Sequence, residues 1–259
     1  MLRTRIIPTL LLDDGGLVKT VKFKNPSYVG DPINAVRIFN DKGADELVLL
    51  DISARANGGP NFRMIKEIVT EAFIPLGYGG GVTNLEQVRE LFRLGVEKVV
   101  LNSAVATSLA LVTSAAAEFG SQSIVVSVDV KKNLFGSYRR VVNSGALDTG
   151  EHPVAFARRA QEAGAGELFL NSVDRDGTMS GYDVDLINRV AREVTVPVVA
   201  CGGAAGVGDL KAAIDAGASS AAAGSMFVFY GRHKAVLITY PDLESLWVTT
   251  SGTPTSGGK

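Results

Sequence analysis

The sequence is poor in cysteine and histidine. Of its 259 residues, one is cysteine (Cys201) and two are histidine (His152 and His233). A single cysteine excludes a disulfide framework and a cysteine-based zinc cluster. Two histidines far apart in the sequence argue against a histidine-rich metal site. We therefore expect neither a bound metal nor a cofactor.

The chain also lacks an excess of charge and a long apolar run. Its 26 basic and 27 acidic side chains leave a net charge of −1, whereas binding to nucleic-acid phosphates needs a basic excess. No segment reaches the ~20 consecutive apolar residues of a membrane span, and the N-terminus lacks the apolar core of a signal peptide. We expect a cytoplasmic protein that binds neither nucleic acid nor a membrane.

Short apolar, β-branched runs alternate with amphipathic stretches along the chain. The runs that predict strands are 5–12, 46–51, 74–77, 98–101, 123–129, 167–171, 196–200 and 221–224. Helical patterns lie between them, for example at 31–42, 85–94, 153–163 and 185–193. Eight strand–helix units favour one α/β domain, a (β/α)₈ TIM barrel over residues 1–248. Residues 249–259 lack apolar side chains and are predicted to be a disordered tail.

The two halves of the chain resemble each other. Residues 43–50 match 164–171 at an offset of 121, 78–81 match 201–204 at 123, and 102–103 match 224–225 at 122. A nearly constant offset across three motifs predicts two duplicated half-barrels that join near residue 120.

Glycine-rich turns follow four of the predicted strands, at the barrel end where active sites are built. Glycine lets the backbone approach an anion closely, and the next helix supplies N–H donors. Two equivalent sets of turns predict an elongated ligand with a phosphate at each end. Ordinary tight turns are the alternative. The turns hold 79–81 and 102–103 in the first half, and 202–203 and 224–225 in the second.

Charged residues supply the remaining candidates. Asp129 ends an apolar strand, where a buried carboxylate is costly unless it has a hydrogen-bond partner or a catalytic role. It is the best candidate for proton transfer. The alternative is that its carboxylate caps the loop that follows the strand. Asp51 ends another strand and is equally consistent with catalysis and with anchoring its loop. Lys19 lies in a long segment, 13–24, whose glycines and lysines are consistent either with a mobile lid or with a solvated basic hairpin. Asp176 and Gly177 fit a loop that closes over a phosphate.

Four charged residues begin strands at the opposite end of the barrel, where residues normally serve stability. They are Arg5, Glu46, Lys98 and Glu167. Two positive and two negative side chains at this end predict a paired ring that closes the barrel floor.

Taken together, these motifs resemble the cyclase subunit of imidazole glycerol phosphate synthase over residues 1–240. The marks are 5–8 (RIIP), 43–47 (GADEL), 79–81 (GGG), 119–122 (FGSQ), 174–183 (DRDGTMSGYD) and 201–204 (CGGA). The resemblance implies a (β/α)₈ barrel docked on a glutaminase, whose ammonia crosses the barrel to a bisphosphorylated ribulosyl nucleotide. That substrate becomes imidazole glycerol phosphate and an aminoimidazole carboxamide ribotide.

The resemblance also assigns roles to residues. One phosphate would be held by Gly81, Asn102 and Ser103, and the other by Asp176, Gly177, Gly202, Gly203, Gly224 and Ser225. The four charges at the barrel floor would form the ammonia gate, which overturns the reading that they serve stability alone.

One position departs from the family pattern. The resemblance implies a catalytic pair of aspartates, of which Asp129 is the second, but Leu11 stands where the first is expected. A leucine neither donates nor accepts a proton, and loss of such a group costs ~10²–10⁴-fold in rate. Asp13 has the same strand parity and is a conceivable substitute. Whether the chain is itself an enzyme therefore stays open.

Leu11 and the neighbouring segments resemble a paralogous branch associated with amidation of sugars in bacterial surface polysaccharides. There, a barrel and a glutaminase supply ammonia to a separate sugar amidotransferase. Two hypotheses follow: an ammonia-conducting subunit with weakened cyclase chemistry, or a working cyclase of histidine biosynthesis. A related two-phosphate isomerase is a third reading, but it needs no ammonia gate.

Overall fold

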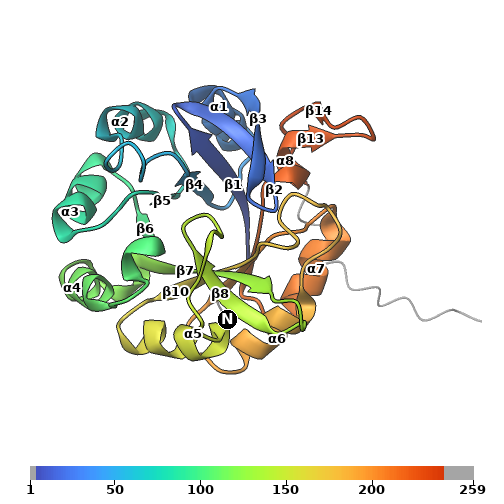
Figure 1. Cartoon of the computed structure of the whole chain (residues 1–259). Helices are drawn as coiled ribbons and strands as arrows, with labels where there is room; N and C mark the ends of the chain where they lie inside the picture. Colours follow the sequence, from blue (N-terminus) through green and yellow to red (C-terminus); the bar gives the residue numbers. More distant parts are fainter. Residues whose placement is uncertain (1–3, 242–259) are drawn as a thin grey trace, which may run out of the picture.

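The computed structural model describes residues 4–241 and shows a closed barrel of parallel strands ringed by helices (Figure 1). The barrel strands pair in the order β1, β4, β5, β6, β7, β10, β11 and β12, and β12 closes on β1. Their bounds are β1 Arg5–Asp13, β4 Leu47–Asp51, β5 Leu76–Gly79, β6 Lys98–Leu101, β7 Ile124–Lys132, β10 Glu167–Ser172, β11 Val198–Cys201 and β12 Ser220–Ala223. The predicted single (β/α)₈ barrel is confirmed.

The helices pack their apolar faces on the outside of this barrel. They are α1 Pro32–Asp41, α2 Phe62–Glu71, α3 Leu85–Leu94, α4 Ala110–Phe119, α5 Pro153–Glu162, α6 Val184–Ala191, α7 Val207–Asp215 and α8 Ser225–Val228, with short 3₁₀ turns η1 Ser103–Val105 and η2 Ser121–Ser123. Local sequence sets their ends. Asn84 caps α3 by accepting a hydrogen bond from the Gln87 amide, and Gly95 ends that helix at a φ of 105°.

Two antiparallel hairpins extend barrel strands beyond the C-terminal end of the barrel. β2 (Gly16–Val21) and β3 (Lys24–Gly30) continue from β1, whereas β8 (Tyr138–Val142) and β9 (Leu147–Asp148) continue from β7. Strands β1 and β7 are the first strands of the two half-barrels, so the hairpins occupy equivalent places. The segment 13–24, interpreted as a lid loop or a solvated hairpin, is ordered β-structure.

The last strand–helix unit departs from a regular barrel. Helix α8 has four residues and is followed by a small hairpin, β13 (Phe229–Tyr230) with β14 (Ala235–Val236). The chain then returns alongside α8 in extended form, because the Leu237 amide donates to the Val228 carbonyl and the Thr239 amide to the Phe227 carbonyl. This returning segment covers the barrel where a full eighth helix was expected.

Most predicted strands match the structure closely, but two are displaced and the fifth is too short: β7 continues three residues past the predicted end at Asp129, because it pairs there with β8. The third and seventh predicted strands, 74–77 and 196–200, begin two residues too early, because their first residues precede the barrel ladder. The predicted tail 249–259 lies outside the described residues. Within residues 4–241, no helix is long and apolar enough to cross a membrane.

Candidate functional site

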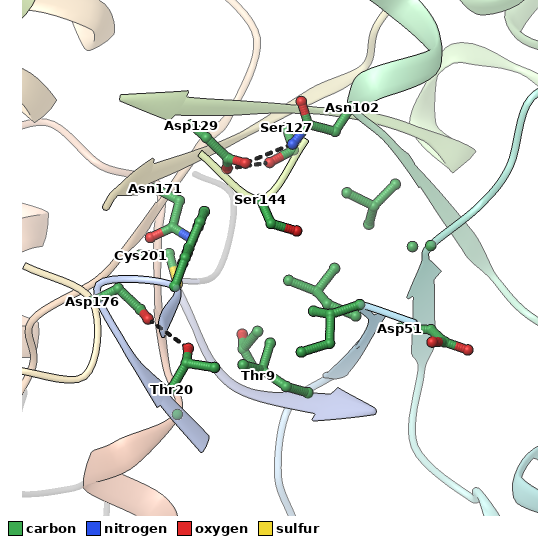
Figure 2. A pocket seen from close by; sticks show the side chains of 18 of the residues that line it. Thr9, Thr20, Asp51, Asn102, Ser127, Asp129, Ser144, Asn171, Asp176 and Cys201 are labelled. Carbon is green, nitrogen blue, oxygen red and sulfur yellow. Dashed lines mark hydrogen bonds between the residues drawn. The ribbon is translucent and has the colours of Figure 1, made fainter. Parts of the chain in front are cut away.

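A pocket of about 600 Å³ opens at the C-terminal end of the barrel (Figure 2). All eight barrel strands contribute to its wall, and both hairpins overhang it. The residues predicted for catalysis and phosphate binding line this one pocket: Lys19, Gly81, Asn102, Ser103, Asp129, Asp176, Gly177, Gly202, Gly203, Gly224 and Ser225. The structure thus brings them together, while their roles stay predictions.

Asp129 is buried in the pocket wall and held by two hydrogen bonds. Its carboxylate accepts one from Asn102 Nδ2 at 2.6 Å and one from Ser127 Oγ at 3.1 Å. Burial raises the pKa of Asp129 to about 6, against the lowering effect of these two donors. A carboxyl group with such a pKa exchanges protons readily near neutral pH, as general acid–base chemistry requires.

Leu11 lies in the same pocket, on the barrel strand opposite that of Asp129. It is 8% exposed and pairs in register with Leu50 of β4. Together with Val100 of β6, these side chains give the pocket an apolar wall. Asp13, the conceivable substitute, ends β1 beside Gly16 and does not line the pocket. The pocket therefore offers no carboxylate from β1.

Asp51 lines the pocket but is committed to its own loop. Its Oδ1 atom accepts hydrogen bonds from the Ser53 amide at 3.1 Å, from Ser53 Oγ at 2.9 Å and from the Ala54 amide at 2.9 Å. The Tyr78 hydroxyl donates to Oδ2 at 3.3 Å. Of the two readings of Asp51, this geometry favours the loop anchor.

The β2–β3 hairpin overhangs the pocket and is fastened to the loop that follows β10. Thr20 Oγ1 donates to Asp176 Oδ2 at 3.2 Å, and the Lys22 amide donates to the Asp176 carbonyl at 2.9 Å. Burial raises the pKa of Asp176, while the charge of Lys19 lowers it. Lys19 is only 5% exposed, so it points into the pocket rather than into solvent.

The two glycine-rich sets lie on opposite sides of the barrel. Gly81 follows β5, whereas Gly202 follows β11, four strands away in the closed ladder. Gly202 has a φ of +94°, and a Cβ there would lie 2.6 Å from the Ser172 carbonyl oxygen, so a side chain has no room. This separation fits an elongated ligand that touches both sides.

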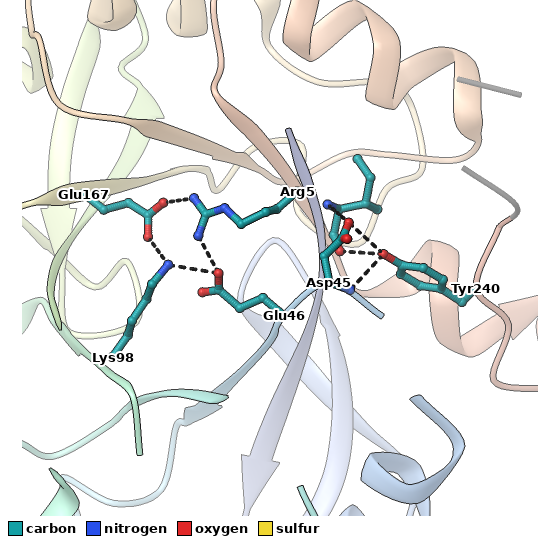
Figure 3. Close-up of polar contacts among 7 residues, drawn as sticks. Arg5, Asp45, Glu46, Lys98, Glu167 and Tyr240 are labelled. Carbon is teal, nitrogen blue, oxygen red and sulfur yellow. Dashed lines mark hydrogen bonds and ion pairs between the residues drawn. The ribbon is translucent and has the colours of Figure 1, made fainter. Parts of the chain in front are cut away.

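The four charged strand starts meet at the opposite end of the barrel (Figure 3). Arg5 pairs with Glu46 and with Glu167, and Lys98 Nζ lies 2.9 Å from Glu46 and 2.7 Å from Glu167. Burial lowers the pKa of Arg5, but the two glutamates outweigh it and the net shift is upward. These four side chains form a closed charged ring.

Between the charged ring and the pocket floor, the barrel interior holds an apolar cluster. It consists of Ile7, Val48, Val100, Val125, Phe169, Val199, Cys201 and Ala222. A neutral molecule such as ammonia is compatible with this lining, whereas an ion would lose its hydration there. Among residues 4–241, no cluster of side chains has the composition of a metal site.

Sequence reasoning missed several residues of the pocket. Ser127 supports Asp129 from the same strand, and the period of two along a strand was a signal that could have found it. Asn171 is 4% exposed and its Oδ1 has no hydrogen-bond partner in the described part of the chain. Arg55 contacts Asn143 across the pocket mouth. Asn171 ends the repeated stretch 164–171, which was a signal that could have found it, whereas no local motif marks Arg55.

Comparisons with known proteins agree with this geometry. The family described as "Histidine biosynthesis protein" matches residues 5–234. A Pseudomonas aeruginosa relative, provisionally named subunit hisF2 of imidazole glycerol phosphate synthase, is 52% identical over 95% of this chain and 99% of its own length. A provisionally named HisF subunit from Leptospira interrogans is 48% identical over 94% of this chain and 97% of its own.

A third relative carries the synthase name without that reservation. It is the imidazole glycerol phosphate synthase subunit HisF of Alkaliphilus metalliredigens, 41% identical over 88% of this chain and 91% of its own length. Matches of this extent leave no part of the barrel unaccounted for. The chain therefore belongs to the histidine biosynthesis protein family, as a HisF-like synthase subunit.

Proposed function

We propose that this HisF-like subunit takes ammonia from a glutaminase partner, conducts it through the barrel, and serves the amidation of a polysaccharide sugar. Its own cyclase chemistry is weakened. The observation that carries this proposal is the combination of Leu11 in the pocket wall with a complete charged ring at the floor. The equipment for ammonia entry is kept, while one half of the expected catalytic pair is replaced.

The remaining geometry supports the ammonia route. The charged ring lies at one end of the apolar cluster in the barrel interior, and the pocket lies at the other. In this proposal the glutaminase docks at the ring end. A separate amidotransferase then uses the ammonia to convert an acetamido group of a sugar to an acetamidino group: the ammonia nitrogen bonds to the carbonyl carbon, and the carbonyl oxygen leaves as water. The pocket holds a phosphorylated ligand at its two glycine-rich sides.

One observation favours the alternative, a working cyclase of histidine biosynthesis. Asp129 is buried, hydrogen-bonded and near neutrality in pKa, and Lys19 projects into the same pocket. A pocket that had lost all proton chemistry would not need a carboxylate in this state.

Reconstitution tests the proposal. The chain, a glutaminase and a sugar amidotransferase are combined, with either glutamine or ammonium salt as nitrogen source, and the amidated sugar is measured by mass spectrometry. We expect glutamine to support amidation only when the barrel is present, while ammonium bypasses it. Equal glutamine-dependent amidation without the barrel would contradict the proposal.

A further inference from the structure

The last described residues of the chain run down the barrel wall and end beside the charged ring. After β14, the returning segment is hydrogen-bonded to α8 through Leu237 and Thr239. The ring of Tyr240 then packs against Phe227, with 5.6 Å between the ring centroids. This packing fixes the direction in which the Tyr240 hydroxyl points.

The Tyr240 hydroxyl joins the starts of two neighbouring barrel strands (Figure 3). It donates to the carbonyl oxygen of Ile6 at 2.9 Å and accepts from the amide of Asp45 at 3.3 Å. The Asp45 carboxylate in turn accepts from the Ile6 amide at 3.0 Å. Both backbone groups of Ile6 are thus bound by side chains. We call Tyr240, Asp45 and Ile6 the strand-start clip.

The strand-start clip stands where backbone pairing between β1 and β4 is missing. The ladder registers Thr9–Leu12 of β1 against Val48–Asp51 of β4 and goes no lower. Ile6 and Leu12 direct backbone groups toward the β4 side, and Pro8 has the same parity. Proline has no N–H to donate, so the ladder lacks a donor at that point.

The clip is adjacent in sequence to two members of the charged ring. Arg5 directly precedes Ile6, and Glu46 directly follows Asp45. Any slip between the starts of β1 and β4 would therefore separate the Arg5 guanidinium from the Glu46 carboxylate. We propose that Tyr240 is a positioning residue for the charged ring, which it holds in register by tying Ile6 to Asp45.

The returning segment therefore has two roles: it covers the barrel wall, and through Tyr240 it positions the charged ring at the barrel floor. The consequence for ammonia entry rests on the proposed function. Without the hydroxyl, the Arg5–Glu46 side of the ring opens more often, and ammonia released by a docked glutaminase escapes at the floor.

Substitution Tyr240→Phe tests the proposal, because it removes the hydroxyl and keeps the ring that packs on Phe227. The matched control is Tyr182→Phe, since the buried Tyr182 hydroxyl also donates to a strand carbonyl, that of Ala222 at 2.8 Å, in another strand. Solvent exchange of the Arg5 guanidinium N–H protons is measured by NMR on the isolated chain. Loss of the two hydrogen bonds that the Tyr240 hydroxyl makes with Ile6 and Asp45 predicts exchange that is faster by about tenfold or more in Tyr240→Phe, and unchanged exchange in the control.

Two results would overturn the proposal. One is Arg5 exchange in Tyr240→Phe that equals the wild-type rate. The other is equal acceleration in Tyr182→Phe, which would indicate general loosening rather than positioning.

A second measurement separates this proposal from the proposed function. The glutaminase and the sugar amidotransferase are added, and the amidated sugar formed is compared with the glutamate released; we expect this ratio to fall in Tyr240→Phe and to stay unchanged in Tyr182→Phe. If no glutaminase complex forms with the wild-type chain, the proposed function fails, while the NMR comparison still decides the role of Tyr240.

Discussion

Leu11 and Asp129 line the same pocket from opposite strands of the barrel, β1 and β7. One side chain can take part in proton transfer and the other cannot. The four charges of the floor beneath them are all paired, and the β2–β3 hairpin overhangs the pocket. The pocket thus has one carboxyl group and one apolar side chain at the two positions where the family resemblance leads us to expect a catalytic pair.

The first prediction concerns the pH dependence of stability. Burial raises the pKa of Asp129 from 3.8 to about 6, so the native state holds this proton more tightly than the unfolded chain. The stabilising contribution of the protonated group is present below about pH 4 and is lost as the pH rises through 6. A pKa shift of this size corresponds to a change of about 3 kcal/mol in the free energy of unfolding.

The measurement for Asp129 is urea unfolding of the wild type and of Asp129→Asn at several pH values. We expect the stability of the variant, relative to the wild type, to increase between pH 4 and pH 6 and to level off above. Parallel profiles for the two proteins would show that Asp129 is not the group responsible.

A second prediction concerns the charged ring. Lys98→Met leaves Glu46 and Glu167 to share Arg5 alone, so we expect the free energy of unfolding to fall by about 1–3 kcal/mol. The loss is smaller than for a fully buried ion pair, because the Lys98 side chain is 18% exposed. Adding Glu46→Gln restores neutrality and should recover part of the loss. Chemical unfolding of both single variants and the double variant measures the coupling; strict additivity would mean that the two side chains do not interact.

The third prediction concerns the hairpin over the pocket. Thr20→Val removes the hydroxyl that binds Asp176. This should lower the free energy of opening the hairpin by about 1 kcal/mol, which is measured as faster amide exchange in β2 and β3. Thr113→Val is the control, because it removes a hydroxyl bonded to the Ala163 carbonyl on the outer helices. Unchanged exchange in Thr20→Val would show that the Thr20 hydroxyl does not fasten the hairpin.

Much of the fold could be predicted from the sequence, because the barrel strands are short apolar runs between amphipathic helices. The first hairpin was one of two readings of 13–24, whose glycines and lysines fit a loop equally well. The second was missed, because 133–148 carries glycine, asparagine and serine, which are typical of loops. The returning segment before Tyr240 was also missed. Its structure depends on contacts with residues such as Ile6, more than 200 positions away.

The candidate site shows a similar division. Strand-end glycines and Asp129 could be found from the sequence, because strand ends converge on one end of a barrel. The commitment of Asp51 to its loop could not be decided, since it depends on Ser53 and Tyr78 as donors. The charged ring was predicted as a paired ring from four charged strand starts, and the structure adds which side chains pair.

The measurement that tests the account most directly is cyclase turnover without a glutaminase. The purified chain receives the bisphosphorylated ribulosyl nucleotide and excess ammonium salt, and substrate loss is followed by absorbance. We predict little turnover for the wild type and a gain of about 10²-fold or more for Leu11→Asp. The control Leu50→Asp, on the neighbouring strand, should show no gain over the wild type. Wild-type turnover at the rate of a HisF subunit that has both aspartates would contradict the account and favour the cyclase of histidine biosynthesis.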